Sequence, residues 1–172
     1  MPLTVLETLP RRELTADFHC VAGWSATNLR WEGVPFESLY RRVIEPALPQ
    51  GISVTHLVLR GLDGWRSVVT IQDALADDVL IADRLDGRPL DGDHGAPARF
   101  LSPQQYGYVN TKHLCRIDVH TAEPKGVHRS PTLRMLGQHP RARVWKEERH
   151  RYLPPWLLRR AYRASIAFIL PR

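Results

Sequence analysis

Glycine and proline occur so often in this chain that they limit what it can fold into. The 172 residues include 14 prolines and 11 glycines, and both residue types interrupt regular structure and favour turns. The sequence therefore predicts short helices and strands joined by many turns. A chain of this length corresponds to one domain with a hydrophobic core of ordinary size.

The clearest strand pattern covers residues 14–21. Leu14, Ala16, Phe18 and Cys20 recur with a period of two, so they share one apolar face of the predicted strand. This register points Cys20 inward. The pattern alone favours a buried structural cysteine, because most free cysteines are buried and behave as small apolar side chains.

The next segments predict a loop and then a helix. Residues 24–36 contain two tryptophans among turn-forming residues and are predicted to form a loop whose tryptophans wall the core. An amphipathic helix is predicted at residues 37–44, and Pro46 and Pro49 are expected to end it. Its apolar stripe consists of Phe36, Leu39, Tyr40 and Val43.

Short strands dominate the rest of the predicted domain. They are expected at residues 54–59, 65–71, 79–84, 98–101 and 114–120, with one helical turn at 72–75. The first two strands are predicted to form a hairpin. In the last strand, Cys115 alternates with the same face as Ile117 and Val119, which predicts a core position for this second cysteine.

Charge divides the chain into two parts. Residues 126–172 hold 11 Lys and Arg against 2 acidic residues, a net of +9, whereas residues 1–125 have a net of −3. We therefore predict a domain at 1–125 and a basic C-terminal extension at 126–172, which belongs to the same structural unit. Pro154-Pro155 is expected to open a helix at 156–170 with an arginine-rich face.

Two cysteines are too few for a disulfide framework. The N-terminus has no basic region followed by a long apolar run, and no run of 18 apolar residues occurs. The sequence is therefore expected to lack a secretion leader and a membrane-spanning helix. These features predict a cytoplasmic location.

An ordered set of motifs resembles a known family. The set consists of Cys20 followed by Gly23-Trp24-Ser25, Trp31-x-Gly33-Val34-Pro35, Asp63-Gly64-Trp65, His94-Gly95-Ala96-Pro97-Ala98-Arg99 and Tyr106-Gly107-Tyr108-x-x-x-Lys112. Their order and spacing across residues 14–122 resemble the molybdopterin-binding domain of the sulfite oxidase family. The resemblance extends to its bacterial oxidoreductase branch, which includes the catalytic subunit of methionine-sulfoxide reductase. It implies an α+β fold with mixed sheets, short helices and many loops.

The resemblance assigns the metal ligand and the cofactor anchors. In this family a cysteine thiolate binds molybdenum, which implies that role for Cys20, and a soft thiolate suits a sulfur-rich redox metal. Arg99 and Lys112 match the cationic positions that hold the pterin phosphate. Without the resemblance, a surface charge beside Phe100 is the favoured interpretation of Arg99.

Four further residues are implied as cofactor contacts. Asn110 and Thr111 lie in the turn beside Lys112, where backbone N–H groups can face a phosphate oxygen. His94 stands where this branch usually has asparagine, and histidine adds a titratable group. Gly61 falls near a further pterin contact of the family.

The resemblance implies a molybdenum- and molybdopterin-dependent oxidoreductase. It would transfer an oxo group to or from a small substrate such as a sulfoxide or sulfite, with Cys20 as the catalytic metal ligand. About 13 residues precede the first predicted strand, fewer than the family usually has, which suggests a more open pocket or weaker cofactor retention. The alternative is a catalytically silent molybdopterin-binding or partner-docking module.

The partner predictions follow from what the sequence carries. It has no haem-attachment motif, so electrons are expected to come from or go to a separate cytochrome or membrane haem subunit. The basic extension is expected to contact an anionic membrane surface peripherally, to dock an acidic electron-transfer partner, or to pack on the domain. Nucleic acid is not an expected partner, because aromatic stacking platforms and recognised binding motifs are missing.

Overall fold

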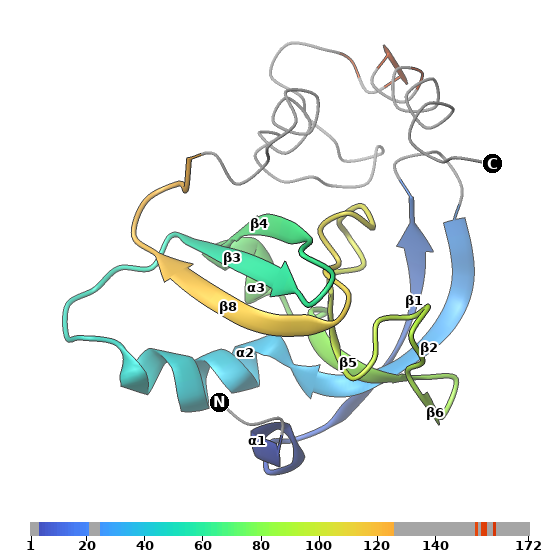
Figure 1. Cartoon of the computed structure of the whole chain (residues 1–172), viewed down its shortest axis with the longest axis horizontal. Helices are drawn as coiled ribbons and strands as arrows, with labels where there is room; N and C mark the ends of the chain where they lie inside the picture. Colours follow the sequence, from blue (N-terminus) through green and yellow to red (C-terminus); the bar gives the residue numbers. More distant parts are fainter. Residues whose placement is uncertain (1–3, 21–24, 126–153, 155, 158–159, 161–172) are drawn as a thin grey trace.

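The structure is a computed structural model, and it describes residues 4–20, 25–125, 154, 156–157 and 160. Short strands form most of its regular structure (Figure 1). In chain order the elements are α1 (Thr4–Glu7), β1 (Arg12–His19), β2 (Ser25–Pro35), α2 (Phe36–Leu39), η1 (Tyr40–Ile44), η2 (Glu45–Ala47), β3 (His56–Gly61), β4 (Arg66–Thr70), α3 (Ile71–Ala74), β5 (Leu80–Leu85), β6 (Arg88–Pro89), β7 (Arg99–Leu101) and β8 (Leu114–His120).

The strands form two sheets. The first has the order β1-β2-β5-β6, with β7 also paired to β5, and the second has the order β4-β3-β8. Every pairing among the described strands is antiparallel, so the expectation of mixed sheets is wrong. Parallel neighbours need long crossover connections, whereas three of these pairs are hairpins with short turns. The sheet-rich architecture with short helices agrees with the predicted fold class.

Two hydrophobic clusters lie on opposite faces of the first sheet. On β5, Ile81 belongs to the larger cluster, whereas Leu80 and Ala82 belong to the smaller one. Phe100 of β7 joins the larger cluster and Leu101 the smaller one. Both strands are therefore buried on both faces at these positions, which explains the apolar runs at residues 79–82 and 100–101.

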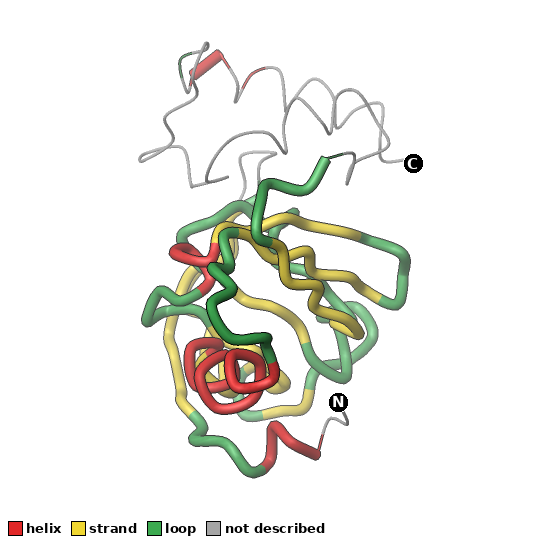
Figure 2. The backbone as a smooth tube through the Cα atoms, turned by 90° about the vertical axis from the view of Figure 1, so that its left-hand side faces the viewer, coloured by secondary structure: helices red, strands yellow, loops and turns green. Residues whose placement is uncertain are grey.

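The helical segment begins where its sequence predicted. Pro35 is the N-terminal cap, and α2, η1 and η2 follow one another without a break. Phe36, Leu39 and Tyr40 are buried, as the apolar stripe predicted. Pro46 lies inside η2 instead of ending the helix. Figure 2 shows this segment end-on beside the strands.

The predicted loop at 24–36 is wrong, because residues 25–35 form the long strand β2. It pairs with β1 on one side and β5 on the other, so tertiary pairing outweighs its weak local propensity. Gly33 marks a shift in register, and a Cβ atom there would lie 2.1 Å from the carbonyl oxygen of Ile81. The glycine lets two backbones approach closely at a bulge.

The core position predicted for Cys115 is also wrong, since Cys115 is exposed. In the β3–β8 ladder, Arg60 is opposite Arg116 and Gly61 is opposite Leu114, with a register shift between them. Cys115 is therefore the extra residue of a β-bulge. The bulge breaks the alternation and turns Leu114 toward the larger cluster along with Ile117 and Val119.

The remaining short elements agree with their predictions. The β3–β4 hairpin, the helical turn α3 and the strands β5, β7 and β8 lie where the sequence placed them. None of the described helices has the length and hydrophobicity to span a lipid bilayer. The helix predicted at 156–170 lies almost wholly outside the described residues.

Candidate functional site

The strand that leads to the predicted thiolate is fixed at its last residue. β1 ends at His19, and Cys20 follows as a partly buried free cysteine. The imidazole Nδ1 of His19 lies 2.7 Å from Ser25 Oγ across the β1–β2 hairpin. The backbone N–H of Gly107 donates to the carbonyl oxygen of His19 at 2.8 Å. The backbone that leads into Cys20 is therefore held on two sides, by Ser25 of β2 and by Gly107.

Gly107 also packs on the ring of Phe18. A Cβ atom at Gly107 would lie 2.5 Å from Phe18 Cζ, so a larger residue would displace the ring. This contact and the Gly107–His19 hydrogen bond join the thiol strand to the segment that carries Asn110, Thr111 and Lys112. The structure therefore brings the predicted metal end and the predicted phosphate end of the site together.

Arg99 is a buried cation, so its interpretation as a surface charge is excluded. It is 3% exposed, and its guanidinium carbon lies 5.1 Å from the centre of the Phe18 ring and 5.3 Å from that of Trp31. Its Nη1 donates to the carbonyl of His94 at 3.1 Å and its Nη2 to that of Asn110 at 3.2 Å. Burial lowers the pKa of Arg99 to about 10.

This cation lacks a counter-charge among the described residues. No carboxylate there bonds the Arg99 guanidinium, and its buried Nε has no hydrogen-bond partner. A buried charge without an opposite charge is costly. An anion beside Arg99 would lower that cost, so the chemistry of this residue fits a phosphate-bearing ligand.

Asn110 builds the loop that follows β7. Its Oδ1 accepts the Ser102 N–H at 2.5 Å, and its buried side-chain nitrogen lies within 3.3 Å of the carbonyl oxygens of Ser102, Gln105 and Tyr106. Its own backbone N–H donates to the carbonyl of Gly107. These bonds give Asn110 a part in shaping the loop, and a direct phosphate contact stays a prediction.

Thr111 is also buried, and its polar groups bond within the protein interior. It is fully buried, its Oγ1 lies 2.7 Å from Ser67 Oγ, and its N–H donates to the carbonyl of Val109 at 2.8 Å. Ser67 on β4 also donates to the carbonyl of Val109 at 3.0 Å. The loop is thereby attached to the second sheet, and a phosphate contact by the Thr111 N–H also stays a prediction.

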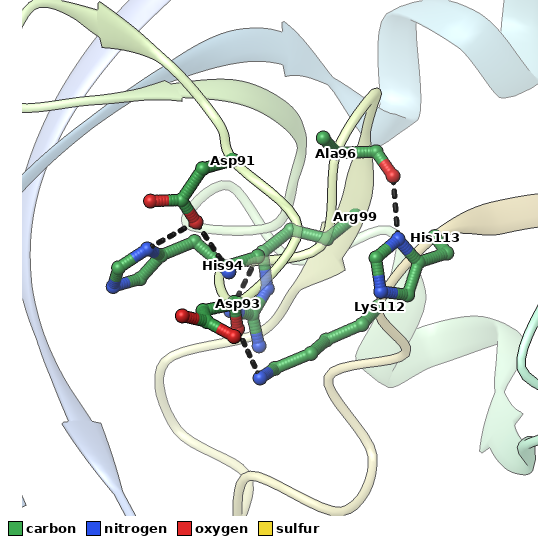
Figure 3. Close-up of polar contacts among 7 residues, drawn as sticks. All are labelled: Asp91, Asp93, His94, Ala96, Arg99, Lys112 and His113. Carbon is green, nitrogen blue, oxygen red and sulfur yellow. Dashed lines mark hydrogen bonds and ion pairs between the residues drawn. The ribbon is translucent and has the colours of Figure 1, made fainter.

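Lys112 lies between two glycines. A Cβ atom at Gly95, whose φ is +100°, would lie 2.9 Å from Lys112 Cβ, and one at Gly61 would lie 2.5 Å from the Lys112 carbonyl oxygen. Gly61 therefore supports Lys112 by close backbone approach. The Lys112 side chain is exposed, and its Nζ donates to the carbonyl of Asp93 (Figure 3).

His94 is held by Asp91 on the same exposed loop. The Asp91 carboxylate accepts the His94 N–H at 2.9 Å and lies 2.7 Å from His94 Nδ1 (Figure 3). The hydrogen bonds from His94, with its charge, lower the pKa of Asp91. Nε2 is the nitrogen that these bonds leave available to a ligand. Asp91 has no place in the predicted motif set. Its sequence signal was its position three residues before His94 in a loop rich in Gly and Asp.

Other supporting residues carried weaker signals. Trp65, from the Asp63-Gly64-Trp65 motif, donates its indole N–H to the carbonyl of Tyr108 at 2.8 Å, and this bond fixes the same loop. Ser67 lies inside a strand with nothing in the sequence to single it out. Among the described residues, no three His, Cys, Asp or Glu side chains gather as ligands for a metal ion.

Comparison with known proteins identifies the family. Residues 1–128 match the family model of the oxidoreductase molybdopterin binding domain. The chain belongs to this family. The match covers every residue of the predicted site, which confirms the resemblance inferred from the ordered motifs.

Relatives of this molybdopterin-binding domain include oxidoreductases. The uncharacterized oxidoreductase YuiH of Bacillus subtilis is 32% identical over 111 residues, covering 63% of this chain and 52% of YuiH. The methionine-sulfoxide reductase catalytic subunit MsrP of Pseudomonas syringae is 27% identical over 159 residues, covering 80% of this chain and 46% of MsrP. The chain spans about half the length of these relatives.

A solved structure shares the fold. The sulfane dehydrogenase SoxCD of Paracoccus pantotrophus superposes with a TM-score of 0.60 at 22% identity, covering 71% of this chain and 35% of the SoxCD chain. At this identity the likeness concerns the fold alone. It shows that the described fold has a counterpart among solved structures.

Proposed function

We propose that this domain holds a molybdenum–molybdopterin cofactor and catalyses oxo transfer to or from a small substrate such as a sulfoxide or sulfite. One observation carries the proposal. Buried Arg99 has no carboxylate partner among the described residues, and it stacks on Phe18 in the strand that leads to Cys20. A cation and a thiol are thereby joined through one short segment, which suits a ligand that carries both a phosphate and a metal with soft ligands.

Each residue of the proposed site has a distinct part. Cys20 supplies a soft thiolate for the metal, and Arg99 supplies buried positive charge toward the phosphate. Lys112 adds a point charge at the rim. His94 can donate or accept a hydrogen bond through Nε2, while Asn110, Thr111 and Gly61 hold the backbone on which these groups stand.

The bound cofactor would supply the change of oxidation state that oxo transfer needs. Reduction of a sulfoxide to a sulfide consumes two electrons and two protons and releases water, and oxidation of sulfite runs in the opposite electron direction. A separate electron-transfer protein, such as a cytochrome or a membrane haem subunit, is therefore part of the proposal. A cytoplasmic location and a peripheral membrane contact by residues 126–172 stay predictions.

The first test measures metal binding. The chain is produced in a host that makes the molybdenum cofactor, and its molybdenum content is determined beside that of Cys20→Ala. We expect about one molybdenum per wild-type chain, and X-ray absorption should show one sulfur ligand fewer in Cys20→Ala. Cys115→Ala removes the other free cysteine and should leave both results unchanged. Equal sulfur coordination in wild type and Cys20→Ala would refute the role of Cys20.

The second test measures turnover of the metal-loaded chain with sulfoxides, other S- and N-oxides and sulfite. Turnover with any of them supports the oxidoreductase. Molybdenum binding with no turnover of any of these substrates would favour the silent binding module instead.

A further inference from the structure

Three arginines lie side by side across the second sheet. Arg60 of β3 is directly opposite Arg66 of β4 on one side and directly opposite Arg116 of β8 on the other. We call Arg66, Arg60 and Arg116 the arginine row. Like charges that face one another across antiparallel strands destabilise a sheet. The sheet therefore carries an arrangement that folding alone does not favour.

The arginine row lies on the face of the sheet that points away from the core. The neighbouring residues Leu59 and Ser67 are buried on the opposite face. Arg66 is exposed, and the Arg116 side chain keeps 67% of its surface exposed. Arg60 in the middle keeps 32%. All three guanidinium groups are thus within reach of a ligand in solvent.

One carboxylate offsets part of this charge. Asp118 accepts hydrogen bonds from Arg60 Nε at 2.6 Å and from Arg116 Nε at 2.5 Å. Burial of Asp118 opposes its ionisation, but the hydrogen bonds from Arg116 and Arg60 lower its pKa. Arg66 forms no ion pair within the described part of the chain. Three positive charges against one negative charge leave an excess of two.

The arginine row borders the candidate cofactor site. Arg60 immediately precedes Gly61, whose backbone lies against the carbonyl of Lys112. The Leu62 N–H donates to the carbonyl of His113 at 3.0 Å, and the Cys115 thiol lies 3.3 Å from the carbonyl of Arg60. In Figure 1, β3 ends and β8 begins at the end of the sheet nearest the loops of the site. A molecule bound on the row would therefore lie beside Lys112.

We propose that the arginine row docks an acidic surface patch of a partner protein. The argument is one of charge complementarity, because a cluster of carboxylates would stabilise arginines that otherwise repel one another. Residues 1–125 carry a net charge of −3, so the row is a local positive site on an acidic domain. On residues 1–125, a compact acidic patch would meet the row without also facing the surrounding carboxylates, whereas a membrane or a long polyanion would extend over them.

The proposed docking site goes beyond the proposed function and does not depend on it. If that function holds, the position beside Lys112 makes an electron-transfer protein the natural occupant. Binding to the row can be measured without molybdenum, so a failure of docking and a failure of cofactor binding are separate results.

The test uses the full chain and a fluorescent polyglutamate peptide, followed by fluorescence anisotropy at low and high ionic strength. Arg66→Glu/Arg116→Glu reverses both ends of the row. Arg42→Glu/Arg88→Glu makes the same charge change at exposed positions on η1 and β6 and is the matched control. We expect the row variant to bind about tenfold more weakly than the control, with the difference shrinking at high salt.

Circular dichroism checks that both variants fold. If the charge reversal unfolds the sheet, Arg66→Gln/Arg116→Gln replaces it, and this variant should weaken binding by a smaller factor. Equal binding by row and control variants, or no binding by the wild type, would overturn the proposal. Anionic vesicles and a DNA oligonucleotide provide two further arms. Row-dependent binding to either of these without row-dependent binding to the peptide would also overturn it.

Discussion

The buried half and the exposed rim of the candidate site are held in different ways. Arg99, Asn110 and Thr111 form the buried half, and each is at most 3% exposed and bonded to backbone or side-chain partners. His94 and Lys112 form the exposed rim, where glycines and Asp91 set the backbone instead. The same short segment of chain thus contains residues that the fold needs and residues that it hardly needs.

This difference separates effects on folding from effects on ligand binding. Changing a residue of the buried half removes interactions that the folded state depends on. Changing a side chain of the rim removes charge or a hydrogen-bonding group at little cost to stability. The backbone beneath the rim is an intermediate case, because its glycines are required by close contacts.

The largest effect is expected in the buried half, from Asn110→Asp. The substitution keeps the shape but places a carboxylate oxygen where the amide nitrogen faces three carbonyl oxygens. We expect the free energy of unfolding to fall by about 3 kcal/mol or more, measured by urea denaturation. Asn110→Ala should cost less, since it introduces no repulsion. A smaller loss in Asn110→Asp than in Asn110→Ala would contradict the hydrogen-bond assignment.

An intermediate effect is expected beneath the rim, from Gly95→Ala. Its φ of +100° and a Cβ position 2.9 Å from Lys112 Cβ both disfavour a side chain. We expect a loss of about 2 kcal/mol in the free energy of unfolding. Gly92→Ala is the control, because nothing lies within 4 Å of its Cβ position, and it should change stability by less than about 0.5 kcal/mol. Equal losses of stability in Gly95→Ala and Gly92→Ala would contradict the requirement for glycine at position 95.

The smallest effect on stability is expected at the rim itself, from Lys112→Gln. The side chain is exposed and bonds one backbone carbonyl, so the free energy of unfolding should change by less than about 0.5 kcal/mol. Molybdenum retained after gel filtration should nevertheless fall. Lys125→Gln, at another exposed lysine, should retain the wild-type amount. Full retention by Lys112→Gln would exclude it as a phosphate anchor.

Local patterns in the sequence were sufficient for the elements that local chemistry decides. Two strand-like runs on either side of a Gly- and Asp-containing turn placed the β3–β4 hairpin, and Pro35 with its following apolar stripe placed the helical segment. β2 could not be predicted in this way, because Gly33 and Pro35 have low strand propensity and the strand depends on β1 and β5. Contacts between distant segments decided that region.

The candidate site shows the same division between what the sequence motifs predict and what contacts between distant segments decide. The ordered motifs identified Arg99 and Lys112, but nothing in the sequence indicated that Arg99 is buried between Phe18 and Trp31. The contribution of Ser67 also depends on a contact between segments 44 residues apart. Residue type and spacing located the candidate chemistry, whereas burial and bonding partners required the three-dimensional structure.

The bulge at Cys115 has a consequence for how this strand tolerates changes in length. Arg116 and Leu114 already face consecutive residues of β3, Arg60 and Gly61, so the ladder assigns no partner to the residue between them. A deletion of that single position would close the ladder into regular pairing with no neighbouring side chain moved to the other face. Elsewhere in a ladder, inserting or deleting one residue moves every later side chain of that strand to the opposite face of the sheet. At position 115, β8 can therefore lose one residue while its other side chains keep their faces.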